Sequence, residues 1–146
     1  MKRTLPWQTP ARNYYPLPKV LCRLGLSPGE IAVYSFLMYC ENRTTYQCYP
    51  SYRTIGEAVG MSRNTVAKYV RQLEEKGLIR TEPSTITTKD GRVRNGSLIY
   101  TICPIQEALE LNYQRQFLQA ERNIEQATAE KKLAELNRQN KKEESA

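Results

Sequence analysis

Residues 54–79 read TIGEAVGMSRNTVAKYVRQLEEKGLI, and this stretch decides the fold. Ile55, Ala58 and Val59 recur at the spacing of one helix face, so they should form the inner side of a short helix. Gly60 follows that face directly and permits a sharp turn of the backbone. The pattern predicts a short helix that ends in a tight glycine turn.

A second helix is predicted after the turn. Ser51 can cap the start of the first helix, and Ser62 can cap the start of the second. Gly77 stands where a helix of this length would end in a left-handed residue. The inner face of the second helix carries three residues at helical spacing: Val66, Val70 and Leu73. The order is helix, tight turn, helix.

An earlier helix and a later hairpin flank this pair. The earlier helix has three start signals: Ser27 can cap it, Pro28 suits its first position, and Glu30 can complete a capping box. Its end is expected near Glu41 or Asn42, and residues 44–49 should form a loop or short strand. The inward positions of the earlier helix are Ile31, Tyr34, Leu37 and Met38.

Two short strands are predicted after the helices. The first covers residues 78–82 and stops at Pro83. The second covers residues 97–102, in which apolar and polar residues alternate. Asp90-Gly91 and Asn95-Gly96 between them are turn signals. Together the elements predict a mainly α fold with a small β-hairpin, followed by a long C-terminal helix.

The stretch 54–79 closely resembles bacterial winged helix-turn-helix DNA-binding proteins, of the kind found in regulators of plasmids, phages and conjugative elements and in replication initiators. Gly56 matches the small residue where the two helices cross, and residues 73–79 match the exit into the wing. Tyr69 departs from the pattern, because many relatives have a small residue there. The resemblance implies a winged helix over residues 27–103 that binds double-stranded DNA.

A major groove admits one α-helix, and residues near the start of that helix read the bases. Arg63 can pair with guanine and Asn64 with adenine, whereas Lys68 and Arg71 are placed for phosphates. The alternative is that these are ordinary solvated helix residues. The residues predicted to contact DNA are Ser51, Tyr52, Ser62, Arg63, Asn64, Thr65, Lys68 and Arg71, together with Lys89, Arg92 and Arg94 at the wing tip.

Residues 1–26 are predicted to be a basic, proline-rich arm with one short helix that Gly25 closes. Two interpretations remain open, and they are compatible: the arm packs over the core, or it touches phosphates or a minor groove. Core packing would involve Tyr15, Leu17, Val20 and Leu21. The arm contains no acidic residue, and its charged and aromatic side chains are Lys2, Arg3, Trp7, Arg12, Tyr14, Tyr15, Lys19 and Arg23.

Residues 104–146 are predicted to be one long helix, for which Pro104 suits the first turn. A heptad pattern starts at Tyr113 and includes Phe117, Ala120, Ile124, Ala127, Lys131 and Ala134. One interpretation is a homodimer through this seam, and the other is that residues 109–117 pack back on the chain's own domain. We expect residues 137–146 to fray.

The amino-acid composition excludes several classes of function. The 146 residues carry a formal charge of +7, which favours acidic partners. The chain has no apolar run near the ~20 residues of a membrane helix and no export signal, so we expect a cytoplasmic protein. It has no histidine, which excludes Ser-His-Asp and Cys-His catalysis. We predict no metal and no cofactor, and we expect Cys22, Cys40, Cys48 and Cys103 to be buried free thiols.

The function that follows is a sequence-specific DNA-binding protein, a transcriptional regulator of a bacterial mobile element, and not an enzyme. An alternative is a replication-initiation protein or its accessory, because residues 13–21 (NYYPLPKVL) and 26–30 (LSPGE) look like the start of such initiators. A third hypothesis is an adaptor that uses the winged helix to bind a protein.

Overall fold

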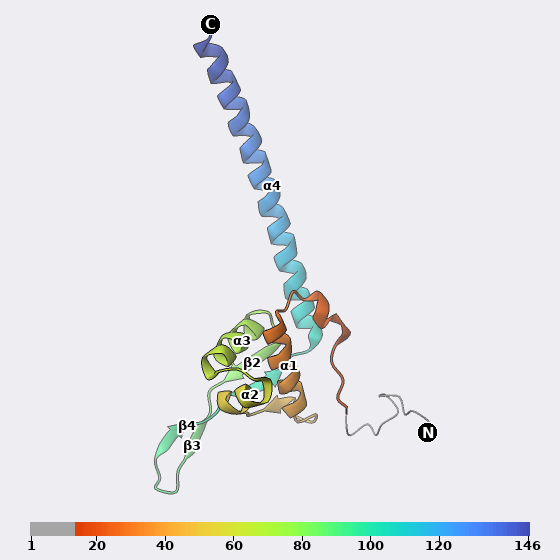
Figure 1. Ribbon diagram of the computed structural model, residues 1–146, viewed down its shortest axis with the longest axis vertical. Helices are drawn as coiled ribbons and strands as arrows, with labels where there is room; N and C mark the ends of the chain where they lie inside the picture. The colour runs from red at the N-terminus through yellow and green to blue at the C-terminus, as the bar shows by residue number, and fades with distance from the viewer. Residues whose placement is uncertain (1–13) are drawn as a thin grey trace, which may run out of the picture. The chain divides into compact units, whose positions relative to one another are not determined.

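The computed structural model describes residues 14–146, and the chain divides into two compact units, Met1–Leu109 and Glu110–Ala146. The expectations for Lys2, Arg3, Trp7 and Arg12 lie outside the described residues. The elements are η3 (Lys19–Arg23), α1 (Pro28–Cys40), β1 (Gln47–Cys48), α2 (Tyr52–Val59), α3 (Arg63–Glu75), β2 (Ile79–Glu82), β3 (Thr85–Thr87), β4 (Val93–Asn95), β5 (Ile99–Ile102) and α4 (Ile105–Glu144). This is a winged helix-turn-helix with a long C-terminal helix, as the sequence predicts (Figure 1).

Each of the three helices α1, α2 and α3 begins at a serine cap. The hydroxyls of Ser27, Ser51 and Ser62 each accept a hydrogen bond from the amide three residues later, at 3.1–3.3 Å. Such caps satisfy backbone donors that a helix start leaves free. The predicted capping box at α1 is wrong in its second half, because the Glu30 carboxylate pairs instead with Lys76.

The turn between α2 and α3 has the predicted geometry. Gly60 has φ 72° and ends α2. Gly56 is buried, and a Cβ there would lie 2.4 Å from the Met61 carbonyl oxygen, so only glycine fits where the chain doubles back. One prediction is wrong: Ala58 is exposed rather than inward, because the inner side of this short helix is formed by Ile55, Gly56 and the partly buried Val59.

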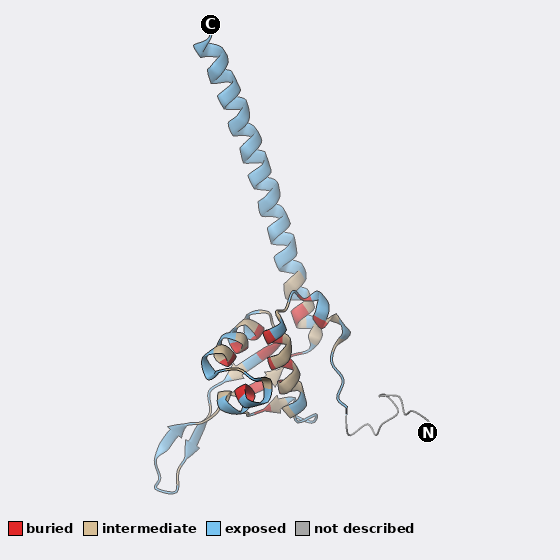
Figure 2. Cartoon of the chain, in the orientation of Figure 1, coloured by how far each residue is buried: buried red, intermediate tan, exposed pale blue. Residues whose placement is uncertain are grey.

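The core lies among α1, α2, α3 and the central sheet, where Figure 2 shows the buried residues gathered. Leu21 and Leu24 of the η3 segment are buried in it, which confirms the packing interpretation for this part of the arm. Tyr15 and Leu17 are 37% and 39% exposed, and the Tyr15 ring lies 6.0 Å from the Tyr39 ring of α1, so these two residues lie at the edge of the domain and not in its core. The largest fully buried side chains are Tyr34, Tyr100, Leu37, Ile55, Leu73, Leu78, Ile79, Val33 and Val66.

A partly buried tyrosine and a glycine fit together where α3 meets α1. A Cβ at Gly29 would lie 2.3 Å from the Tyr69 ring, so the ring occupies the space that a side chain would fill. Tyr69, the departure from the family pattern, is therefore accommodated by a glycine at the start of α1.

The sheet is antiparallel, with strand order β1-β5-β2, and β5 lies in the middle. The wing continues beyond it as a separate hairpin, β3-β4, in which Ile86 pairs with Arg94. Figure 1 shows this hairpin extending away from the helices. The turn at Asp90-Gly91 is as predicted, and Gly91 has φ 76°. Asn95-Gly96 makes no such turn: a Cβ at Gly96 would lie 2.7 Å from the Ser84 hydroxyl, so this glycine allows the two sides of the wing to approach closely.

α4 is one continuous helix of 40 residues that reaches Glu144, so it includes most of the segment that was expected to fray. Its first turn is held by Arg80 of β2, whose guanidinium donates to both carboxylate oxygens of Glu107 at 3.0 and 2.8 Å. None of the helices described for residues 14–146 combines the length and apolar character that a membrane crossing requires.

The four cysteines are free thiols, as expected. Cys48 and Cys103 are buried and Cys40 is partly buried. Cys22 is exposed, which corrects the expectation of burial: it follows the buried Leu21 on a single 3-10 turn and points to the other side.

Candidate nucleic-acid interface

The outer face of α3 is a row of exposed polar and cationic side chains. Arg63, Asn64, Lys68 and Arg71 are exposed. Asn64, Lys68 and Arg71 lie opposite the face that buries Val66, Val70 and Leu73, whereas Arg63 is the first residue of the helix, two turns before Val70. From residue 63 to residue 72, α3 has three cations and no acid. The Lys68 ammonium also lies 5.6 Å from the centre of the Tyr69 ring, a distance suited to a cation–π contact.

The start of α3 is fixed by a pair of hydroxyls. Ser62 Oγ accepts from the Thr65 amide at 3.3 Å, and the two hydroxyl oxygens are 2.9 Å apart. These contacts set the first turn, which carries Arg63 and Asn64. The two predicted site residues Ser62 and Thr65 thus have a structural role at this position.

The start of α2 presents a second polar surface. Ser51 is its cap, and Tyr52 is partly buried against the core. Arg53 was not predicted from the sequence, yet it is exposed at the same helix start and pairs with Glu57 at 2.9 Å. The i, i+4 spacing of Arg53 and Glu57 was the signal that could have singled it out.

The wing tip carries the three predicted cations, Lys89, Arg92 and Arg94, and all are exposed. The turn is closed by the Thr88 amide, which donates to the Arg92 carbonyl at 2.8 Å, and by the Gly91 amide, which donates to the Thr88 carbonyl at 2.9 Å. Arg94 lies in β4, and Arg92 lies in the turn one residue before that strand.

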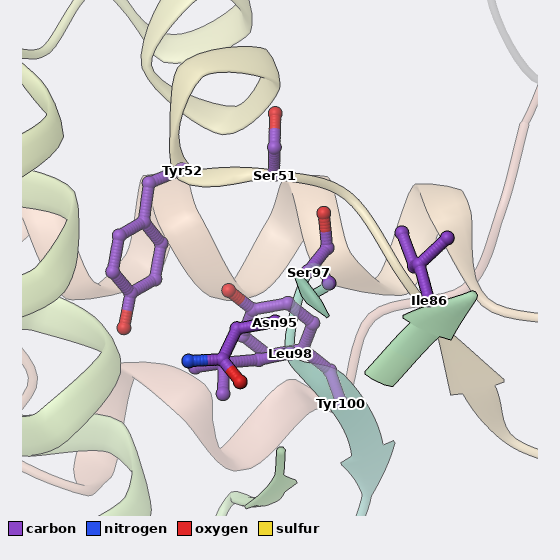
Figure 3. Close-up of a pocket in the computed structure, with 8 residues that line it drawn as sticks. Ser51, Tyr52, Ile86, Asn95, Ser97, Leu98 and Tyr100 are labelled. Carbon is purple, nitrogen blue, oxygen red and sulfur yellow. The ribbon is translucent and has the colours of Figure 1, made fainter. Parts of the chain in front are cut away.

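A hollow of about 430 Å³ joins the start of α2 to the root of the wing. Figure 3 shows Ser51 and Tyr52 on one side of it and Asn95, Ser97 and Leu98 on the other. Tyr100 forms part of its wall, and the Tyr100 hydroxyl has no hydrogen-bond partner among residues 14–146. Burial first, and then the neighbouring Tyr52, raise the pKa of Tyr100 above its usual range. Its hydroxyl therefore stays a neutral donor.

The predicted site residues form three groups within the winged helix. Asn64, Lys68 and Arg71 share one face of α3, and Ser62, Arg63 and Thr65 lie at its start. Ser51 and Tyr52 lie beside the root of the wing, and the wing cations lie in β4 and the turn before it. The predicted dimerisation residues Tyr113, Phe117, Ala120, Ile124 and Ala127 are all exposed on α4. Within the part of the chain that the structure describes, no three Cys, Asp or Glu side chains gather as a metal ion would require.

Residues 24–79 match the family model described as a helix-turn-helix domain. Among curated proteins, none matches this sequence significantly. Similar solved structures include a possible transcriptional regulator from Methanosarcina mazei Go1, with 16% identity, 75% of this chain and 82% of that chain covered, and a TM-score of 0.49. A MarR-family transcriptional regulator from Silicibacter pomeroyi has 20% identity, 80% and 76% coverage, and a TM-score of 0.39. Lactococcus lactis ZitR in complex with DNA has 18% identity, 88% and 86% coverage, and a TM-score of 0.35.

Proposed function

We propose that this protein is a transcriptional regulator that binds double-stranded DNA in a sequence-specific manner. The observation that carries the proposal is the run of exposed cations in α3 between residues 63 and 72, a run that contains no acidic residue, within a stretch that matches a helix-turn-helix domain. Such a helix fits one major groove. The resemblance of residues 54–79 to regulators of mobile elements extends the proposal to a regulator of a bacterial mobile element.

The proposed contacts divide by chemistry. Arg63 and Asn64, in the first turn of α3, meet base edges, where arginine prefers guanine and asparagine prefers adenine. Lys68 and Arg71, farther along the same face, meet phosphates and fix the register of the helix in the groove.

The remaining contacts are with the DNA backbone. The hollow between α2 and the wing root offers a concave surface for a sugar-phosphate strand, and the start of α2 favours a phosphate through its free backbone donors. Ser51 and Tyr52 lie at this point. Lys89, Arg92 and Arg94 add three cations at the wing tip, which suits phosphates or a minor groove.

We further propose that α4 pairs with α4 of a second copy. Tyr113, Phe117 and Ile124 of the heptad seam are 65–66% exposed, which is costly for large apolar side chains in a single copy. A two-fold dimer would present two α3 helices to the two halves of an inverted repeat. We expect the DNA target to show this symmetry.

Two matched lysine variants test the DNA proposal. The binding of the full chain to a labelled 30-mer duplex (~30 bp, about three helical turns) is measured by fluorescence anisotropy over a range of salt concentrations. Lys68→Ala should weaken binding and lower the salt slope by about 0.9 for one lost phosphate contact. Lys132→Ala on α4, the control, should leave the slope unchanged.

The outcomes separate the proposal from its rivals. If the two variants and the unaltered chain show equal salt slopes, the assignment of this face of α3 to the DNA interface is contradicted. No measurable binding to any duplex would favour the protein-binding adaptor.

A further inference from the structure

A second cavity lies in the winged helix, and none of the predicted DNA-contact residues lines it. Its volume is about 490 Å³, within the range of small-molecule sites. It is formed where the end of α1 meets the end of β5 and the start of α4. The apolar part of its wall is made by Pro18, Met38, Ile102, Pro104 and Ile105.

One carboxylate interrupts these apolar walls. Glu41 follows the last turn of α1, and its Oε2 atom is buried without a hydrogen-bond partner among residues 14–146. Burial raises the pKa of Glu41 above its ordinary value of 4.5, although Arg43 opposes the shift. A buried carboxylate oxygen without a partner costs free energy that a ligand can recover by donating to it.

The other polar groups of the wall point to the same ligand chemistry. Tyr34 and Cys103 line the cavity near Glu41, and the pKa of Tyr34 is raised to about 12, by burial first and then by Glu41. Burial likewise raises the pKa of Cys103. Both groups are therefore neutral at pH 7, which leaves the Glu41 carboxyl as the group in this wall that carries a negative charge when ionised.

Tyr46 lines the cavity from a strained backbone position. Its φ is 59°, in the left-handed region that a tyrosine rarely adopts. The strain is held by two backbone hydrogen bonds, from the Tyr46 amide to the Asn42 carbonyl at 2.6 Å and from the Ile102 amide to the Tyr46 carbonyl at 2.9 Å. Tyr46, Met38 and Glu41 also line an adjoining hollow of about 230 Å³. Strain that is kept at a cavity wall is typical of binding sites.

We propose that this cavity binds a small organic amine, with the ammonium group on Glu41 and an apolar body between Met38 and Ile102. A buried carboxylate oxygen without a partner is compensated best by a cation that also donates hydrogen bonds. The rings of Tyr34 and Tyr46 suit the same cation. The apolar walls exclude a ligand that is polar throughout.

Three probes of similar size and different charge test the site. 2-Phenylethylamine, 2-phenylethanol and phenylacetate are titrated separately into the ¹⁵N-labelled full chain, and amide shifts are followed by NMR. The amine should shift the amides of Met38, Ile102 and Cys103 in a saturable manner. The alcohol should bind more weakly at the same residues, and phenylacetate should leave them unshifted.

Two carboxylate variants provide the decisive comparison. Glu41→Gln should weaken binding of the amine by about tenfold or more, because a charge-assisted hydrogen bond is lost, and should change binding of the alcohol much less. Glu57→Gln, at an exposed ion pair on α2, should change neither. An amine that produces no saturable shift at these residues, or that binds Glu41→Gln as well as the unaltered chain, would overturn the proposal, and neither result depends on DNA binding.

Discussion

Gly56 and Gly60 are four residues apart, and the structure requires a glycine at each for a different reason. At Gly56 the space is filled by the Met61 carbonyl. At Gly60 the space is open, but φ is 72°. Gly56→Ala should therefore lower the free energy of unfolding by about 2 kcal/mol or more, since backbone must move. Gly60→Ala should cost only about 1 kcal/mol for the left-handed conformation. Urea denaturation measures both, and a larger loss at Gly60 would contradict this account of the turn.

The effect of Glu41→Gln on the free energy of unfolding should depend on pH. Because its pKa is raised in the folded chain, its contribution to stability is fully present below the unfolded pKa and is lost as the pH rises through the folded pKa. Glu41→Gln should therefore gain in stability relative to the unaltered chain as the pH rises from about 4 to 7. Denaturation at the two pH values measures this, with the exposed Glu82→Gln as control. If the free energies of unfolding of Glu41→Gln and the unaltered chain differ by the same amount at both pH values, burial does not destabilise the ionised Glu41 carboxylate, and this account is contradicted.

For individual residues, the sequence predicted the serine caps of the helices and the glycines of the turns, because these depend on neighbours within four residues. The sequence did not predict the ion pair of Glu30, because its partner Lys76 is 46 residues away. It also did not predict why a glycine stands at position 96, which is the close approach of the opposing Ser84 side chain. Local patterns cannot show such contacts. The role of Tyr69 was also hidden, because the glycine that accommodates it lies in another helix.

Among the elements, α1 and the end of α3 are joined by a partly buried ion pair. Glu30 Oε2 and Lys76 Nζ are 2.7 Å apart, and Lys76 also donates to the Gly25 carbonyl at 3.3 Å. The side chain of Glu30 is only 4% exposed. Lys76→Met leaves this carboxylate without its cation, so we expect a loss of about 2 kcal/mol in the free energy of unfolding.

The exposed pair Arg53–Glu57 is the matched control for that loss. Its side chains are 70% and 68% exposed, and such surface pairs contribute little. Arg53→Met should change the free energy of unfolding by less than about 0.5 kcal/mol. If Lys76→Met and Arg53→Met lower the free energy of unfolding equally, the ion pair between α1 and α3 contributes no more to stability than a surface pair.

The elements were predictable to different degrees. The helices α1, α2 and α3 follow from caps and periodicity. The strands β3 and β4 were not predicted within the wing, because they have only three residues each and all six are exposed, so no alternation of burial marks them. In the candidate site, the face of α3 was predictable from helical spacing, whereas the hollow at Tyr100 depends on how α2 meets the wing.

For the whole molecule, α4 poses the question of assembly. The sequence singled out one apolar seam, but Leu118, Leu133 and Leu136 are also 51–60% exposed on α4. At about 100° per residue these leucines lie on a different side from Phe117 and Ile124. The exposed apolar side chains of α4 therefore form two stripes, of which the sequence indicated one.

The proposed dimer is tested on the first stripe. Ile124→Asp should convert a dimer into a monomer in sedimentation experiments, because a charge would be buried in the seam. Gln126→Asp, on the opposite side of the helix, is the control and should leave the dimer intact. If the unaltered chain sediments as a monomer, or if Ile124→Asp remains a dimer, pairing through this seam is contradicted.

The central claim is that α3 reads DNA sequence, and selection of binding sites from a random duplex library at near-physiological salt tests it most directly. The unaltered chain should enrich an inverted repeat, and Arg63→Ala should lose preference at one position in each half-site, with a cost of about 1–3 kcal/mol. Tandem direct repeats would favour the replication-initiation role. An absence of any enriched sequence, or an unchanged preference in Arg63→Ala, would contradict the assignment of α3 to the major groove.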